Sequence, residues 1–142
     1  MSNAEVVKYV YEKFAQGDAP SILATFDRNI EFRLAEGHPY SPEGKPWIGG
    51  DAITKNFFLK AGPEWDGWSM RMHQILDAGD AVIVEGRYHG LYRPTGKMLD
   101  VQVCHVWRFS GGKIISFHQY LDTGRLQEGM RQEPSKAAGR GI

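Results

Sequence analysis

The chain has 142 residues with 17 basic and 17 acidic side chains, and 42% of its residues are hydrophobic. This length fits one domain, which we expect over residues 1–130, with a flexible C-terminal tail over 131–142. The hydrophobic fraction excludes global disorder, and a net charge near zero argues against nucleic-acid binding through a broad basic face. No apolar run approaches the roughly 20 residues that span a bilayer, so no membrane partner is expected.

The chain's one cysteine, Cys104, excludes an intrachain disulfide and a thiolate zinc cluster. No two histidines have a local ligand spacing such as H-x-x-x-H, so the sequence predicts no metal and no other cofactor. No basic segment followed by an apolar one opens the sequence, so a cytoplasmic location is expected.

Helices dominate the predicted N-terminal half. Apolar residues at three- and four-residue spacing predict a helix over 5–14, with Ser2 and Glu5 in capping-box positions. Asp18 caps a second, short helix, and alternation predicts a strand over 29–34. Segment 35–50 has three prolines and four glycines and is long enough to be a lid or binding loop. Asp51 caps a third helix that ends at Gly62-Pro63.

The pattern then changes to period two. Strands are predicted over 68–76, 81–92, 99–109 and 114–121, followed by a short helix that Thr123 caps and that runs through Met130. Helices followed by consecutive hairpins indicate an α+β fold, with helices on one face of a mostly antiparallel sheet.

The last hairpin sets which side chains share a face. A three-residue loop over 110–112 places Gly112 at the left-handed position and pairs His105 with Phe117. Ile115 then faces the helices, and Gly86 on the preceding strand leaves a gap there. A gap among aromatic and polar side chains predicts a pocket. The helix-facing set comprises His105, Trp107, Phe117, Gln119, Val82, Val84 and Tyr88.

Four segments carry a family resemblance, and together they cover residues 6–126. They read YEKFAQGDAPSILATFDRNIEFR, WIGGDAITKNFF, AGDAVIVEGRYHG and CHVWRFSGGKIISFHQYLDT. The chain resembles the nuclear transport factor 2-like superfamily, in its SnoaL-like, ketosteroid-isomerase-related branch. This resemblance implies a cystatin-like cone, in which three N-terminal helices pack on one face of a curved sheet. It also implies a small-molecule pocket and a homodimer formed through the outer sheet face.

The family's chemical positions match this chain in part. The isomerase's tyrosine on the first helix falls at Val10, its general-base aspartate at Leu34 and its oxyanion-hole acid at His105. The catalytic aspartate of the related cyclases and epoxide hydrolases falls at Gln119. Since most of these positions differ from the family's pattern, the resemblance does not carry over a known mechanism.

His105 is the predicted catalytic residue, as an acid, a base or a donor to a developing oxyanion; the alternative is a neutral core histidine. Gln119 is expected to orient a ligand, because an amide cannot take a proton at neutral pH. Three further residues either form the apolar pocket wall or belong to an ordinary core. They are Trp107, Phe117 and Tyr88.

Loop 35–50 adds further candidates. Trp47 is expected to roof the pocket and bind substrate, while Glu36 and His38 offer acid–base partners if the loop folds inward. The alternative for both is a solvated loop position. His73, His89 and His118 are assigned to the outward face, where they suit a wet dimer interface.

Two classes of function remain open. The first is an enzyme without a cofactor that performs acid–base chemistry of the isomerase, cyclase, dehydratase or hydrolase type. Its substrate would be small, largely apolar and oxygen-bearing. The second is a non-catalytic ligand-binding module or a dimerisation module of the same fold. A filled interior would favour the dimerisation module.

Overall fold

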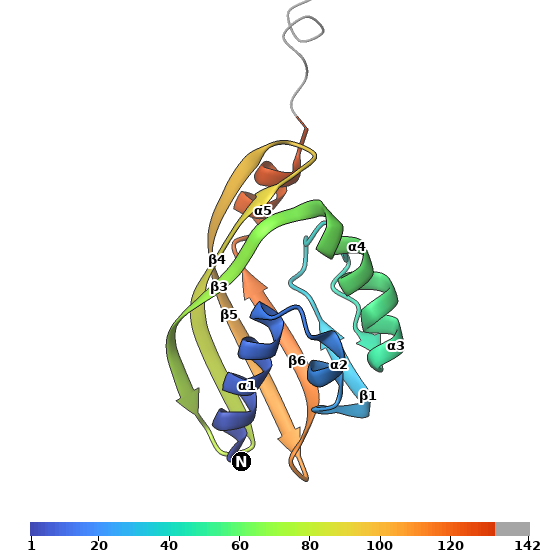
Figure 1. Ribbon diagram of the computed structural model, residues 1–142, viewed down its shortest axis with the longest axis vertical. Coiled ribbons are helices and arrows are strands. Elements are labelled where there is room, and N and C mark those ends of the chain that lie inside the picture. The colour runs from blue at the N-terminus through green and yellow to red at the C-terminus, as the bar shows by residue number, and fades with distance from the viewer. Residues whose placement is uncertain (133–142) are drawn as a thin grey trace, which may run out of the picture.

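A computed structural model describes residues 1–132, so the predicted tail lies almost entirely outside the described residues. Figure 1 shows the helical segments and the strands. In chain order they are α1 (Asn3–Ala15), α2 (Ala19–Leu23), β1 (Phe26–Arg33), β2 (Trp47–Ile48), α3 (Gly50–Ile53), a π-helix (Thr54–Phe58), α4 (Leu59–Ala61), a 3₁₀-helix (Gly62–Glu64), β3 (Trp65–Asp77), β4 (Ala81–Tyr92), β5 (Lys97–Ser110), β6 (Lys113–Leu121) and α5 (Thr123–Met130).

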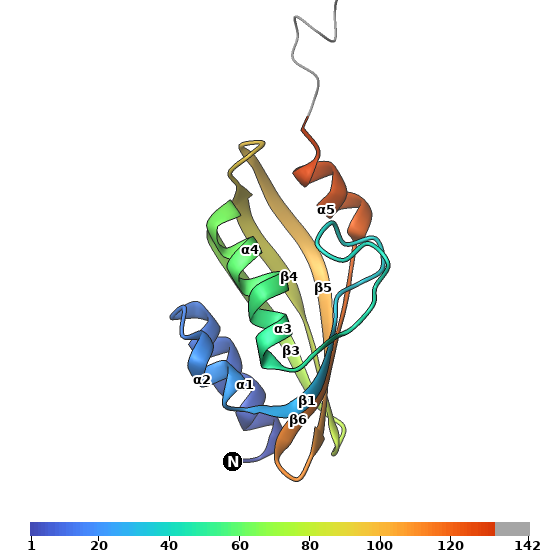
Figure 2. The ribbon, with the colours of Figure 1, turned by 90° about the vertical axis from the view of Figure 1, so that its right-hand side faces the viewer.

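The strands form one curved sheet in the order β2-β1-β6-β5-β4-β3. All neighbouring pairs are antiparallel except β1 and β6, which run parallel. Figure 2 shows α1, α2 and the α3–α4 segment on one face of this sheet, while α5 lies at one end beside loop 35–46. The predicted α+β cone is therefore confirmed.

Helix ends are close to those predicted, but some caps differ. Ser2 and Glu5 form the expected capping box of α1. Helix α3 begins after Gly49, which has φ of 84° and no side-chain cap bond, so Asp51 is not the cap. Asp122, and not Thr123, caps α5 by accepting from the backbone N–H of Arg125.

The predicted third helix is not regular. A π-helix over Thr54–Phe58 separates α3 from α4. One extra residue per turn rotates the side chains that follow it, so local apolar spacing alone does not fix where they point. Phe57 and Phe58 are half-buried and line the space beneath the helix.

The β5–β6 turn differs from the predicted three-residue loop. Ser110 pairs with Lys113, so the loop is the two residues Gly111 and Gly112, both with positive φ. The strand then contains a bulge, because the pairing passes over Ile115. Ile114 is 0% exposed and Ile115 is 37% exposed, so Ile114 faces the core and the expected inward position of Ile115 is wrong.

The shorter loop alone would turn the side chains of β6 to the opposite face of the sheet. The extra residue of the bulge returns the side chains after it to the buried face. His105 lies opposite Gln119, and Trp107 lies opposite Phe117. The predicted pairing of His105 with Phe117 is therefore wrong, although all four side chains do lie on the buried face.

Gly86 does not leave a gap in the sheet. A Cβ atom there would lie 2.2 Å from the Arg71 carbonyl oxygen and 2.9 Å from the Met70 Cε. The β3 backbone itself fills the space, since the β3–β4 register shifts between Met72 and Gln74. Glycine is needed at this position for close backbone approach and does not create the cavity.

The buried hydrophobic residues form two clusters. The larger lies between α1, α2 and the sheet and includes Val7, Ile30 and Trp107. The smaller lies toward α5 and includes Val101 and Leu126. None of the helices within residues 1–132 is both long and apolar enough to cross a membrane.

Candidate functional site

A cavity of about 460 Å³ lies between the sheet and the helices, with walls from both hydrophobic clusters. This volume falls in the range of small-molecule sites. Within residues 1–132, no Asp, Glu, Lys or Arg side chain lines it. Its polar lining consists of uncharged side chains: Tyr11, His38, Tyr40, Trp65, Trp68, Tyr88, His105, Trp107 and Gln119.

His105 lies at the centre of the buried polar side chains. It projects from β5 and is 4% exposed. The Tyr11 hydroxyl lies 2.6 Å from Nδ1, and the Tyr88 hydroxyl is hydrogen-bonded to Nε2. Both ring nitrogens are therefore occupied. We refer to Tyr11, His105 and Tyr88 as the Tyr–His–Tyr network.

Each tyrosine of the network also accepts a second hydrogen bond. Trp107 Nε1–H donates to the Tyr11 hydroxyl at 3.0 Å. Gln119 Nε2–H donates to the Tyr88 hydroxyl at 3.1 Å. The backbone N–H of Ala35 donates to Gln119 Oε1 at 3.3 Å, which fixes the orientation of that amide.

Burial sets the protonation state of the network. Desolvation lowers the pKa of His105 to about 3, so the imidazole is neutral near pH 7. Desolvation also raises the pKa of Tyr11 and that of Tyr88 above the ordinary tyrosine value. Both hydroxyls are therefore protonated donors.

A count of hydrogens shows that one donor in the network is unused. Neutral His105 has one N–H and one acceptor nitrogen, so it accepts from one tyrosine and donates to the other. The tyrosine that accepts from His105 keeps its own hydroxyl hydrogen. Within residues 1–132, the only hydrogen-bond partners of the two hydroxyls are the groups named above. Either tautomer thus leaves one tyrosine O–H without an acceptor, on a side chain that lines the cavity.

Loop 35–50 folds inward and places His38 at the cavity. His38 is 5% exposed, and its ring contacts those of Tyr40 and Phe57. Tyr40 in turn donates to the Glu64 carboxylate and accepts from Trp65 Nε1 at 3.1 Å. Glu36 is exposed, so of the two loop candidates only His38 faces the interior.

The predicted wall residues occupy different places. Tyr88, Trp107 and Phe117 line the cavity, together with Gln119. Trp47, the expected roof, does not line it. Its ring stacks on Phe32 and Phe57, so it supports the wall from behind.

Tyr11 is the functional candidate that the sequence interpretation missed. The predicted apolar stripe of α1 used Val10 and Phe14, and the family's tyrosine position was matched to Val10. Tyr11 lies four residues after Val7 and three before Phe14, which is also helical spacing and could have identified it. Leu34, at the family's aspartate position, is fully buried and does not line the cavity.

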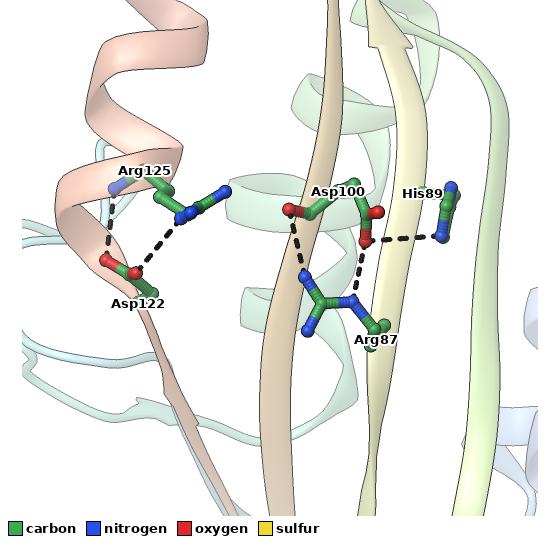
Figure 3. A network of polar contacts seen from close by, with 5 residues as sticks. All are labelled: Arg87, His89, Asp100, Asp122 and Arg125. Carbon is green, nitrogen blue, oxygen red and sulfur yellow. Dashed lines mark hydrogen bonds and ion pairs between the residues drawn. The ribbon is translucent and has the colours of Figure 1, made fainter.

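The outer sheet face carries a separate polar cluster. Figure 3 shows Arg87 and His89 of β4 converging on Asp100 of β5. Arg87 Nε lies 2.7 Å, and His89 Nε2 3.2 Å, from Asp100 Oδ1. Arg87 holds the pKa of Asp100 below its usual range. Within residues 1–132, no three His, Cys, Asp or Glu side chains group closely enough to hold a metal ion.

Solved structures share this fold. A nuclear transport factor 2-like protein from Burkholderia thailandensis is 34% identical, with 92% of this chain and 98% of that chain covered and a TM-score of 0.85. A putative polyketide cyclase from Pseudomonas putida is 19% identical, with 92% and 99% covered and a TM-score of 0.75. A protein with a ketosteroid isomerase-like fold from Catenulispora acidiphila is 14% identical, with 94% and 96% covered and a TM-score of 0.76.

The comparison with curated proteins gave no match. The SnoaL-like domain family matches residues 7–117, which is most of the chain. This match agrees with the helix-covered sheet and with the fold shared by the three structures. The chain belongs to the SnoaL-like domain family.

Proposed function

We propose that the protein binds a small, uncharged and largely apolar ligand and holds one of its oxygen atoms on the Tyr–His–Tyr network. The observation that carries this proposal is His105 with a tyrosine hydroxyl on each ring nitrogen, which leaves one hydroxyl hydrogen unused at the cavity wall. A buried donor without an acceptor is costly, and a ligand carbonyl or ether oxygen would satisfy it.

The chemistry of the cavity wall selects against charged ligands. A carboxylate or ammonium group would lose its hydration and find no opposite charge among the described lining residues. Aromatic rings from Phe32, Phe117 and Trp107 instead offer flat apolar surface. Gln119 lies beside the network and donates to the Tyr88 hydroxyl, and so holds that hydroxyl in position for the same oxygen.

As an enzyme, the protein would use the network to polarise a carbonyl. A tyrosine O–H donated to a carbonyl oxygen stabilises the negative charge that develops when water takes a proton from the neighbouring carbon. Because both nitrogens of His105 are engaged, His105 acts on a ligand through a tyrosine. This would be the donor half of acid–base chemistry of the isomerase or cyclase type.

A second candidate function is ligand binding without turnover. One observation favours it: within residues 1–132, the cavity lining has no carboxylate, and carboxylates are common general bases. A binding protein needs the same cavity and donor but no proton acceptor.

One ketone tests both functions. Wild-type protein should bind 2-acetylnaphthalene more tightly than 2-ethylnaphthalene by about two- to tenfold, the value of one hydrogen bond. Quenching of tryptophan fluorescence reports binding, since Trp65, Trp68 and Trp107 line the cavity. The double variant Tyr11→Phe, Tyr88→Phe should lose this preference, while Tyr120→Phe on the outer face should keep it. Equal affinity of wild type for the two compounds would contradict the proposal.

Deuterium exchange separates enzyme from binder. Nuclear magnetic resonance follows exchange of the acetyl methyl hydrogens of the bound ketone in D₂O. Faster exchange with wild type that is abolished in a folded His105→Gln variant indicates catalysis. Tight binding with exchange at the rate of free ketone supports the non-catalytic module.

A further inference from the structure

His38 is a second polar group at the cavity that the Tyr–His–Tyr network does not use. Its Nδ1 accepts the backbone N–H of Tyr40 at 3.1 Å. A neutral imidazole that accepts at Nδ1 carries its hydrogen on Nε2. Burial lowers the pKa of His38 to about 4, so the ring is neutral near pH 7.

The Nε2–H of His38 has no acceptor within residues 1–132. Among these residues, Thr54 Oγ1 is the one side-chain polar atom that is shielded from solvent and also has no hydrogen-bond partner. Because His38 Nε2 likewise has no partner but is not such an atom, it retains solvent-accessible surface. Since His38 is 95% buried and lines the cavity, we place that surface inside the cavity.

The loop holds His38 in place before any ligand binds. Gly37 N–H donates to the Pro42 carbonyl at 2.9 Å, and Gln127 Nε2 of α5 donates to the Gly37 carbonyl at 2.7 Å. The backbone N–H of Ser41 closes a turn onto the His38 carbonyl at 2.9 Å. A donor fixed in this way loses little freedom on binding, which favours affinity.

We propose that His38 donates a second hydrogen bond to the ligand, and that the cavity therefore selects an uncharged ligand with two acceptor oxygens. One oxygen occupies the Tyr–His–Tyr network and the other accepts from His38 Nε2–H. This inference rests on the proposed function, because the first oxygen must bind the network. Aromatic diketones and related compounds with two separated carbonyl groups belong to this class.

Matched diketones and monoketones test the proposal. The diketones are 1,3-diacetylbenzene, 1,4-diacetylbenzene and 2,6-diacetylnaphthalene. Each is compared with the analogue in which an ethyl group replaces one acetyl group. At least one diketone should bind wild type about four- to twentyfold more tightly than its analogue. About twofold of this ratio is statistical, because either of the two equivalent acetyl groups can occupy the Tyr–His–Tyr network. The rest comes from one hydrogen bond.

His38→Asn is the sharpest variant. The Asn Oδ1 can still accept the Tyr40 N–H, while the donor at the Nε2 position is lost. The advantage of the diketone should fall to about twofold in this variant and stay unchanged in His73→Asn, on the exposed face of β3. The affinity of the monoketone should stay unchanged in both.

If the variant fails to fold, ¹⁵N-histidine-labelled wild type gives the same test. The His38 Nε2–H resonance should shift with the diketone and not with the monoketone. The inference is overturned if every diketone stays within twofold of its analogue, or if the full advantage survives in folded His38→Asn. Failure of the proposed function looks different, because wild type would then bind 2-acetylnaphthalene no more tightly than 2-ethylnaphthalene.

Discussion

His38 and His105 are both buried among aromatic rings, and burial affects both in the same way. Each lacks an opposite charge in the cavity, so desolvation favours the neutral imidazole. Neutral rings act as hydrogen-bond donors and acceptors of fixed direction. At the scale of single residues, the site therefore consists of oriented donors without formal charge.

Acid should destabilise the fold through these two histidines. Burial lowers the pKa of His38 to about 4 and that of His105 to about 3, against an ordinary value of 6.5. The unfolded chain therefore binds more protons below pH 6.5. The contribution of the two neutral histidines to the free energy of unfolding is fully present above that pH. It falls as the pH drops toward 4, by up to about 1.4 kcal/mol per pH unit for each histidine.

Urea unfolding at pH values from 7.5 to 4.5 measures this loss. Each of His38→Asn and His105→Gln should reduce the slope of unfolding free energy against pH. Carboxylates such as Asp100, whose pKa is also lowered, likewise make the free energy of unfolding fall in acid. The effect of each histidine is therefore the difference in slope between wild type and variant. Parallel slopes for wild type and both variants would show that neither histidine titrates on unfolding.

The bulge at Ile115 determines the site at the scale of elements. A two-residue turn without the bulge would pair His105 with His118 and turn Gln119 away from the cavity. The bulge adds one residue to β6, so Gln119 lies opposite His105 on the same face. One extra residue thus places the amide against Tyr88.

A matched pair of isoleucine variants tests this register. Ile114→Ala should lower the free energy of unfolding by about 2–5 kcal/mol, because Ile114 is fully buried. Ile115→Ala should cost less than about 1 kcal/mol, because its side chain points outward. Equal losses, or a larger loss at Ile115, would mean that the strand lies in the register without a bulge.

At the scale of the whole molecule, the sheet has one face covered by helices and one open face. On the open face, Val106 and Ile83 are half-buried apolar residues that lie opposite each other on β5 and β4, and Arg87 and Asp100 form an ion pair farther along the same two strands. Following the family resemblance, we propose that two copies pair through this face. Apolar side chains flanked by charged pairs suit such an interface.

Sedimentation equilibrium tests the pairing. The wild type should sediment at about twice the chain mass of 16.0 kDa. Val106→Asp should sediment at the chain mass, because a buried unpaired charge is costly. The folded variant should still bind 2-acetylnaphthalene, since the cavity lies on the other face. A wild type that sediments at the chain mass at all concentrations would refute the proposal.

Local patterns determined most of the elements. β4 spans 81–92 as predicted, and α1 has its predicted capping box, because alternation and capping depend on residues a few positions apart. The same alternation placed Trp107, Phe117 and Gln119 on one face with His105. The sequence by itself therefore determined the α+β fold, the family and most of one cavity wall.

Tertiary structure decided how the site is completed. Tyr11 and His105 are 94 positions apart and meet only when α1 packs on the sheet. The bulge at Ile115 and the inward turn at His38 depend on cross-strand pairing and on contacts with α5. Such contacts are selected by the packing of the whole chain, and no short stretch of sequence encodes them. Hence the fold was predictable and His38 and His105 were candidates, while the contacts of the Tyr–His–Tyr network and the inward position of His38 were not predictable.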